Sequence, residues 1–209
     1  QLYKEVPARF HDLLDIATYV FAADQSIKRG AKDVETFGGN WRRRLHFVVP
    51  VSDVDFWRSD EVKQCLQATL GFLSDDHYEF EFVPITHRPS FQGFLNFNDK
   101  GAILGFPEQV VMFSGGLDSL GGAVDEIVNQ KRRVVLVNHR PTQKLDRRYR
   151  EIREGLDAKA PNNPPRHIRV TVDKQNWMNK EYSQRTGSVL FVALGGTSAN
   201  MRGQSTGRV

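Results

Sequence analysis

The sequence predicts an α/β protein: a parallel sheet flanked by helices, preceded by a smaller α+β domain. Two observations carry this prediction. Short apolar runs alternate with helical patterns over residues 106–209, as expected for parallel strands buried on both faces. Residues 1–105 instead contain strands in which apolar residues alternate with others. We therefore expect two domains, 1–105 and 106–209, in this chain of 209 residues.

The first domain is expected to combine helices with half-exposed strands. Apolar residues recur at helical spacing over residues 8–23 and again over 59–74. Alternation over 45–51 predicts a strand that ends near Pro50, and Tyr78, Phe80 and Phe82 alternate with glutamates in a second strand. A further short strand is expected over residues 94–97.

The second domain is expected to alternate strand and helix. Val110–Phe113 and Val134–Val137 are continuous apolar runs, which indicates strands buried on both faces. Alternation of Ile168, Val170 and Val172 predicts a third strand. The intervening segments have helical patterns and cover residues 117–130, 146–156 and 188–200. This order predicts one parallel sheet covered by helices.

Composition excludes several classes of protein. The chain has 29 Lys and Arg against 25 Asp and Glu, a net charge of +4. A lone cysteine, Cys65, excludes an internal disulfide and a cysteine-rich zinc site, so zinc is not expected within these residues. The lone cysteine makes a reducing, cytoplasmic setting the simplest expectation. No apolar run reaches the ~18 residues of a membrane span. Gln at position 1, and a polar end over 201–209 that resembles a turn before a new strand, suggest further sequence on both sides.

The most informative segment is Phe113-Ser114-Gly115-Gly116-Leu117-Asp118-Ser119, between a buried strand and a helix start. Free backbone N–H groups and the positive end of the helix dipole favour phosphate at such a place. Glycines let the backbone approach oxygen atoms, and the two serine hydroxyls can donate hydrogen bonds. Asp118 can hold a divalent cation. The alternative is a strand-to-helix turn in which Asp118 or Ser119 only caps the helix.

This loop differs from three other motifs. No lysine follows the glycines, as the P-loop requires, and neither GxGxxG nor GxSxG is present at this position. The loop instead resembles the SGGxDS signature of the PP-loop ATP pyrophosphatases, whose fold is of the adenine nucleotide alpha hydrolase type. The resemblance implies ATP and Mg²⁺ as ligands, cleavage of ATP between its α and β phosphates, and adenylation of a carboxylate or carbonyl oxygen.

Within that family the chain is most similar to the 7-cyano-7-deazaguanine synthase branch, and closest to its larger relatives in bacterial anti-phage systems of the Qat and CBASS types. Several stretches besides the loop carry this resemblance: Leu14–Ala17, Ala22–Asp24, Trp41–Arg43, Val49–Val51, Phe72–Asp76, Leu136–Arg140 and Arg185–Ser188. It implies a small carboxylate substrate like 7-carboxy-7-deazaguanine, and partners among the proteins of a defence operon. The biosynthetic enzymes carry a cysteine-rich zinc site that this chain lacks.

The rest of the site is expected at the carboxyl ends of neighbouring strands, where ligands of parallel sheets bind. Asn138, His139 and Arg140 follow the second strand, and the third is expected to end near Asp173. Lys144 can assist pyrophosphate departure, and the family often has an arginine at the position of Arg185; surface lysine and helix cap are the competing interpretations. The predicted nucleotide-binding residues are Phe113, Ser114, Gly115, Gly116, Leu117, Asp118, Ser119, Asn138, His139, Arg140, Lys144 and Arg185, with Ser114, Asp118 and Ser119 catalytic and Asp118 the metal ligand.

Three functions remain open. The first is an AMP-forming ligase that passes an adenylated carboxylate to ammonia or to a protein amine. The second is asparagine-synthetase-like amidation, although residues 1–105 offer no glutaminase domain beginning with cysteine. The third is a binding module for nucleic acid or a partner protein, since residues 131–150 contain eight Lys or Arg and one acid, Asp146.

Overall fold

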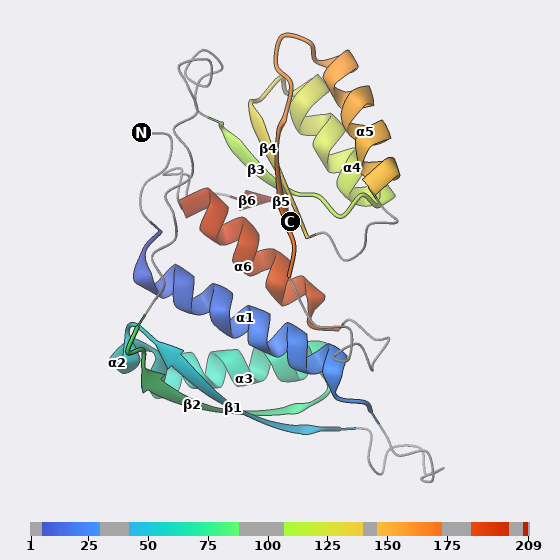
Figure 1. The fold of residues 1–209 in the computed structure, drawn as a ribbon. Coiled ribbons are helices and arrows are strands. Elements are labelled where there is room, and N and C mark those ends of the chain that lie inside the picture. Colours follow the sequence, from blue (N-terminus) through green and yellow to red (C-terminus); the bar gives the residue numbers. More distant parts are fainter. Residues whose placement is uncertain are drawn as a thin grey trace. The chain divides into compact units, whose positions relative to one another are not determined.

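The computed structural model describes residues 6–29, 42–87, 107–139, 146–172, 185–200 and 207–208. The chain divides into two compact units, drawn in Figure 1. The N-terminal unit comprises Pro7–Phe91 and Lys174–Ala193, and the C-terminal unit comprises Gln1–Val6, Gln92–Asp173 and Leu194–Val209. The predicted domain boundary near residue 105 and the predicted strand over 94–97 lie outside the described residues.

The N-terminal unit is built on two parallel strands joined through helices. Its elements are α1 (Ala8–Ser26), β1 (Arg44–Val51), α2 (Val54–Arg58), α3 (Asp60–Ser74) and β2 (His77–Pro84). The register runs from Arg44 opposite His77 to Val51 opposite Pro84. A parallel pair requires a crossover, which α2 and α3 supply. The two predicted helices and two predicted strands are therefore confirmed, with small changes at their ends.

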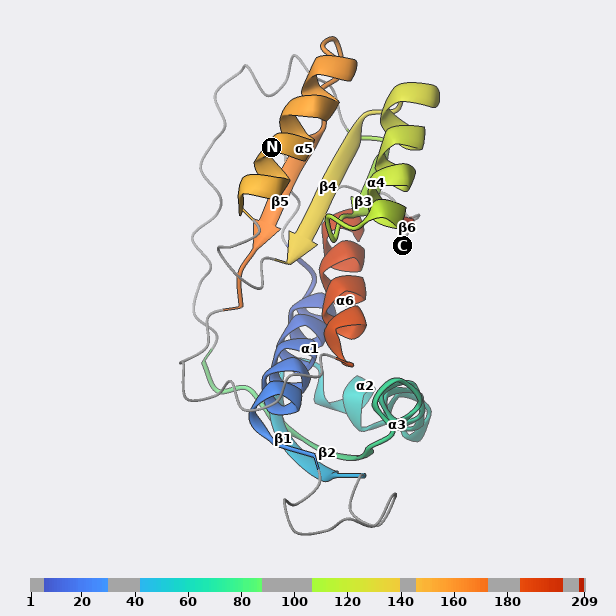
Figure 2. The same ribbon diagram turned by 90° about the vertical axis from the view of Figure 1, so that its right-hand side faces the viewer.

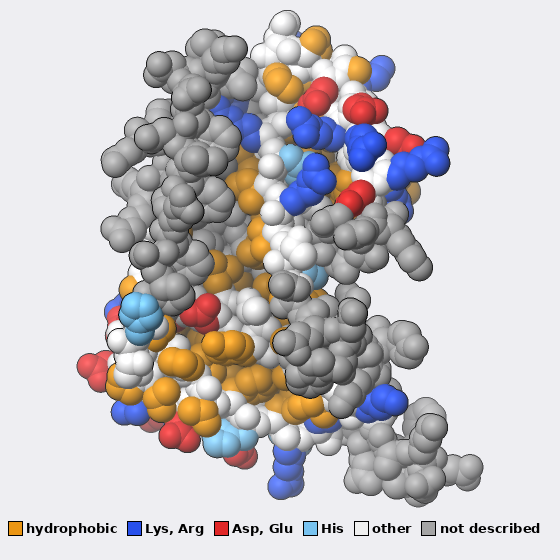
Figure 3. All heavy atoms as spheres, in the orientation of Figure 1, with side chains coloured by type: hydrophobic (Ala, Val, Ile, Leu, Met, Phe, Trp, Pro, Cys, Tyr) orange, Lys and Arg blue, Asp and Glu red, His pale blue; other side chains and the backbone are white. Residues whose placement is uncertain are grey.

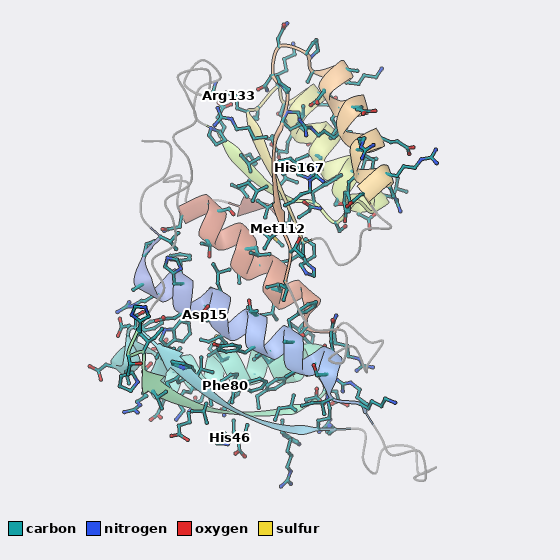
Figure 4. All side chains as sticks on the ribbon, viewed as in Figure 1. Asp15, His46, Phe80, Met112, Arg133 and His167 are labelled. Carbon is teal, nitrogen blue, oxygen red and sulfur yellow. The ribbon has the colours of Figure 1, made fainter. Side chains whose placement is uncertain are left out.

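The aromatic residues of β2 form the centre of this unit's core. Tyr78, Phe80 and Phe82 are buried and stack along the strand, with ring centroids 6.3 and 5.6 Å apart. Phe80, labelled in Figure 4, belongs to a cluster with Ile16 of α1 and Leu70 of α3. Most of the alternate residues of both strands are exposed, as the pattern of period two predicts.

Helix α2 was not predicted from the sequence. It has five residues, too few for a periodic apolar pattern, and it begins because Oδ1 of Asp53 accepts a hydrogen bond from the backbone N–H of Phe56 at 3.2 Å. The buried Trp57 of this helix donates its indole N–H to Oδ2 of the buried Asp12. This contact ties α2 to α1.

The C-terminal unit is a parallel sheet with helices on it (Figure 2). In chain order its elements are β3 (Gln109–Met112), α4 (Leu117–Val124), the π-helical η2 (Asp125–Asn129), β4 (Val134–His139), α5 (Asp146–Lys159), β5 (Arg166–Val170), the end of α6 (Gly187–Asn200) and β6 (Gly207–Arg208). The strand order is β5-β4-β3-β6, and every neighbouring pair is parallel. The molecule is thus a mixed α/β protein with parallel sheets flanked by helices, compatible with a Rossmann-like fold.

Both faces of the larger sheet are covered, as the continuous apolar runs predict. On one face, Val111 and Leu136 pack with Ala123, Ile127 and Leu156 of the helices α4, η2 and α5. On the other face, Gly195 of α6 lies against Met112, with so little space that a Cβ at this glycine would come within 2.4 Å of the Met112 sulfur. Burial of β4 over its whole length follows from this double covering.

Three predicted elements differ in extent. The strand predicted over Ile168–Val172 is wrong at both ends, because β5 pairs with β4 from Arg166 to Val170 and stops where its partner stops, at His139. The helix predicted over 117–130 changes to π geometry after Val124, with the N–H of Gln130 bonded to the carbonyl of Asp125. Gly207 and Arg208, within the segment expected to be a polar turn, form the short strand β6 beside β3.

Candidate phosphate-binding loop and its surroundings

The predicted phosphate loop connects β3 to α4, and its own hydroxyl groups close it. Ser114 Oγ lies 3.0 Å from Ser119 Oγ and accepts a hydrogen bond from the N–H of Gly116 at 3.3 Å. Ser119 Oγ also donates to the carbonyl of Gly116 at 3.1 Å. These contacts hold the loop around the start of the helix. The structure thus brings together Phe113 to Ser119, in the strand-loop-helix setting that the sequence predicts.

Backbone donors collect at the first turn of α4. The N–H groups of Leu117, Asp118 and Ser119 occupy the helix positions that have no intrahelical partner. The helix dipole adds a partial positive charge at the same end. No side chain caps this end of the helix, so capping by Asp118 or Ser119, the alternative interpretation of the motif, is not what the structure has. This end of α4 therefore suits an anion.

Asp118 is exposed in this first turn. A carboxylate beside a phosphate site needs a cation to offset the repulsion, and Mg²⁺ is commonly held by one or two carboxylates together with phosphate oxygens. Within the described part of the chain, no group of three His, Cys, Asp or Glu side chains could hold a metal ion by itself. The residues present fit a cation that is shared with a bound phosphate.

Asn138 is the most unusual polar group near the loop. It is fully buried at the carboxyl end of β4, and neither its amide nitrogen nor its amide oxygen has a hydrogen-bond partner among the described residues. Alternation along β4 puts it on the face of Val134 and Leu136, which is the face that α4 and α5 cover. A buried, unpaired amide is destabilising by about 1–3 kcal/mol, a penalty that a polar ligand would remove. Next to it His139 is buried as well.

Strand order puts the loop at the expected place for a ligand in an open sheet. From β3 the chain proceeds through β4 to β5 on one side and then returns to β6 on the other side of β3. In sheets of this kind ligands bind outside the carboxyl ends of the strands, where the order reverses. The loop at Ser114 follows β3, one of the two strands at this reversal.

Beneath the loop lie three aromatic side chains that the sequence did not single out as a group. The Phe113 ring meets Tyr149 of α5 edge-on at 6.1 Å, and it meets His167 of β5 at 5.9 Å. Neither imidazole nitrogen of His167, which is labelled in Figure 4, has a hydrogen-bond partner in the described structure. Burial, together with the positive charges of Arg169 and Arg153, lowers the pKa of His167 to about 4. It is therefore neutral at pH 7.

The described structure does not test the remaining predicted site residues. Arg140, Lys144 and Asp173 lie outside the described residues. Arg185 lies in the turn before α6, in the N-terminal unit, where its guanidinium is 3.4 Å from the carbonyl of Ser74. Its contact with phosphate stays a prediction.

A second polar cluster lies inside the N-terminal unit. Asp24, Arg29, Arg43 and Asp76 form a buried network in which Arg43 bonds Asp24 at 2.5 Å and Asp76 at 2.6 Å. Burial by itself raises the pKa of Asp76, but hydrogen bonds from Arg43 outweigh it and hold this pKa below its usual value. The network joins the end of α1 to the starts of β1 and β2, and buried ion pairs of this kind fix structure rather than bind ligands.

An open hollow of about 650 Å³ also lies in the N-terminal unit, between α3 and the two strands. It is lined by residues that include Arg42, Phe72 and Asp75, and it contains none of the predicted site residues. Its lining has no unpaired buried polar side chain among the described residues. The loop has backbone donors and an unpaired buried amide near it, and the hollow has no such group in its described lining. The loop is therefore the better candidate for the functional site.

A comparison of the chain with models of known protein families, with curated protein sequences and with solved structures finds no match. In the described part of the chain, no helix has the length and apolar character needed to cross a membrane.

Proposed function

We propose that this protein binds ATP with its phosphates on the loop Ser114–Ser119 and acts as an AMP-forming ligase of the PP-loop ATP pyrophosphatase type. One observation carries the proposal: a glycine-serine-aspartate loop, with free backbone donors, follows a buried parallel strand at the reversal of strand order. The unpaired amide of Asn138 supports it, since a polar ligand would supply the hydrogen-bond partners that this buried group lacks.

The chemistry needs positioning and charge neutralisation more than a side-chain nucleophile. An oxygen of the substrate carboxylate forms a bond to the α-phosphorus of ATP, and the bond from that phosphorus to the oxygen bridging the β-phosphate breaks. Pyrophosphate leaves with the bonding electron pair. An amine nitrogen then attacks the activated carbonyl carbon, AMP departs, and the amine releases a proton to solvent. Backbone donors at Leu117 to Ser119 would stabilise the phosphate charge, and a Mg²⁺ ion held by Asp118 would share it.

The substrate proposed for this site is a small carboxylate like 7-carboxy-7-deazaguanine, and the acceptor is ammonia or an amino group of a protein. Both come from the resemblance of the sequence to the 7-cyano-7-deazaguanine synthase branch, and an anti-phage setting comes from the same source. Product analysis by mass spectrometry, with ATP and candidate acids, tests them.

The decisive experiment measures pyrophosphate release from ATP by Asp118→Ala beside the wild type. Release should fall by at least 100-fold if Asp118 holds the cation, an effect of the order that loss of one charge-stabilising group has on a reaction step. Glu154→Gln, which removes an exposed carboxylate from α5, is the control and should leave release unchanged. Undiminished release by a folded Asp118→Ala would remove the loop from the mechanism.

A second function, nucleic-acid binding, is favoured by one observation. Lys and Arg side chains gather over α5 and β5 in Figure 3. Acidic side chains are interspersed among them, however, and ion pairs join Arg147 to Glu151 at 2.8 Å and Arg153 to Asp157 at 3.6 Å. This surface is therefore less positive than the sequence suggests. DNA binding with a steep dependence on salt, in a protein that does not bind ATP, would select this function.

A further inference from the structure

The first turn of α5 holds the phosphate loop by a single side chain. The hydroxyl of Tyr149 donates a hydrogen bond to the carbonyl oxygen of Ser114, with 2.7 Å between the two oxygens, across 35 residues of sequence. Tyr149 is 4% exposed, and its ring packs edge-on against Phe113. The tyrosine is thus fixed on one side by the core and reaches the loop on the other.

This bond controls the direction of a backbone donor. The peptide group between Ser114 and Gly115 is planar, and in a trans peptide the N–H points opposite to the C=O. Because the Ser114 carbonyl points at Tyr149, the N–H of Gly115 points away from α5. Rotation of this peptide would break the bond to the tyrosine hydroxyl, so Tyr149 keeps the N–H of Gly115 in one direction.

The tyrosine ring also dictates which residue can follow Ser114. Gly115 has a φ of +76°, a conformation that L side chains rarely adopt. A Cβ at this position would lie 2.6 Å from Cε1 of Tyr149. The lack of a Cβ at Gly115 therefore lets the Tyr149 ring lie against the loop.

We propose that Tyr149 is a positioning residue for the phosphate chain of the nucleotide, holding the Ser114–Gly115 peptide so that its N–H donates to a phosphate oxygen. The inference rests on the proposed function, and it adds a residue of α5 to the site. Tyr149 itself touches no phosphate. It acts through the backbone, and a donor fixed in advance stabilises charge without a reorganisation penalty.

Tyr149→Phe isolates the hydroxyl, because the ring and its packing remain. Affinity for magnesium pyrophosphate, measured by titration calorimetry, should fall about five-fold, the effect of losing one ordinary hydrogen bond. The KM for ATP should rise by about the same factor, with kcat for pyrophosphate release changed less, because a ground-state phosphate contact is weakened. Tyr19→Phe, which removes the hydroxyl of a half-exposed tyrosine on α1, is the matched control and should change neither value.

A purely structural role for Tyr149 predicts a different result: a lower unfolding temperature with unchanged pyrophosphate affinity and KM. That outcome would overturn the proposal. If the wild type itself binds neither pyrophosphate nor ATP, the proposed function fails, and with it the basis of this inference. If the wild type binds both and Tyr149→Phe binds them equally well, only the role of Tyr149 fails.

Gly115→Ala tests the same contact from the loop side. The added methyl group must displace the ring or the peptide, so pyrophosphate affinity should fall at least ten-fold, more than in Tyr149→Phe. Gly121→Ala is the control, because a Cβ there has open space on the exposed face of α4. Equal affinities for Gly115→Ala and Gly121→Ala would contradict the proposed fit between the ring and the loop.

Discussion

Thr186 donates two hydrogen bonds to one oxygen of Asp24, from its backbone N–H at 3.2 Å and from its hydroxyl at 3.1 Å. The two residues are separated by 162 positions in the sequence, and both are fully buried. The other oxygen of Asp24 accepts from Arg43. One carboxylate thus joins the end of α1 to the residues just before α6, and it does so inside the N-terminal unit.

Replacement of Asp24 should destabilise the protein strongly. Asp24→Ala leaves the buried Arg43 with one carboxylate fewer and the donors of Thr186 unpaired, so the free energy of unfolding should fall by about 3–5 kcal/mol. Arg42→Ala is the control, because its ion pair with Asp75 is exposed and should contribute less than about 1 kcal/mol. Urea denaturation measures both. Equal midpoints for the two variants would contradict the structural role of the network.

The stability of the protein should fall in two steps as the pH is lowered. His167 has a pKa of about 4 in the folded protein, below its ordinary value of 6.5, so the unfolded chain binds more protons between these values. Stability is therefore full above pH 6.5 and declines as the pH falls toward 4. The lowered pKa of Asp76 adds a separate loss at pH values below its ordinary value of 3.8.

Replacement of His167 by leucine should remove the first step and leave the second. The leucine side chain is apolar, as its neighbour Phe113 is, and it cannot take up a proton. Thermal unfolding of His167→Leu and of the wild type, followed between pH 7.5 and 3, checks this. A decline between pH 6.5 and 4 that persists in the variant would show that another group causes it.

Replacement by alanine should change the stability of the protein differently at two neighbouring glycines of α6. Gly196 is exposed and has open space where a Cβ would be, so Gly196→Ala should stabilise the protein by about 0.5–1 kcal/mol through helix propensity. A Cβ on Gly195 would collide with the side chain of Met112, whose sulfur must then move. Gly195→Ala should therefore be less stable than Gly196→Ala by about 1–3 kcal/mol.

Chemical denaturation of the two glycine variants gives this difference directly. The double variant Gly195→Ala/Met112→Ala should be more stable than the sum of the two single effects predicts, because the smaller side chain at position 112 removes most of the collision. A Gly195→Ala variant as stable as Gly196→Ala would mean that α6 does not pack closely on β3.

Local patterns in the sequence were sufficient to predict most of the helices and strands. The continuous apolar run at Val134–Val137 predicts a strand covered on both faces, and β4 is buried throughout, because both faces of its sheet carry helices. The phosphate loop could be located for the same reason: its glycines and serines stand between an apolar run and a helical period. The short helix α2 escaped prediction, since five residues show no period.

The sequence by itself determined the alternation of strands and helices and the position of the loop at Ser114–Ser119, because these depend on neighbours within a few residues. Tertiary structure alone decided that β1 and β2 pair in parallel, that β5 ends at Val170, and that Tyr149 meets Ser114 and Thr186 meets Asp24. Such contacts join segments that lie far apart in the chain. Their partners are selected by the packing of whole elements, which no local period in the sequence records.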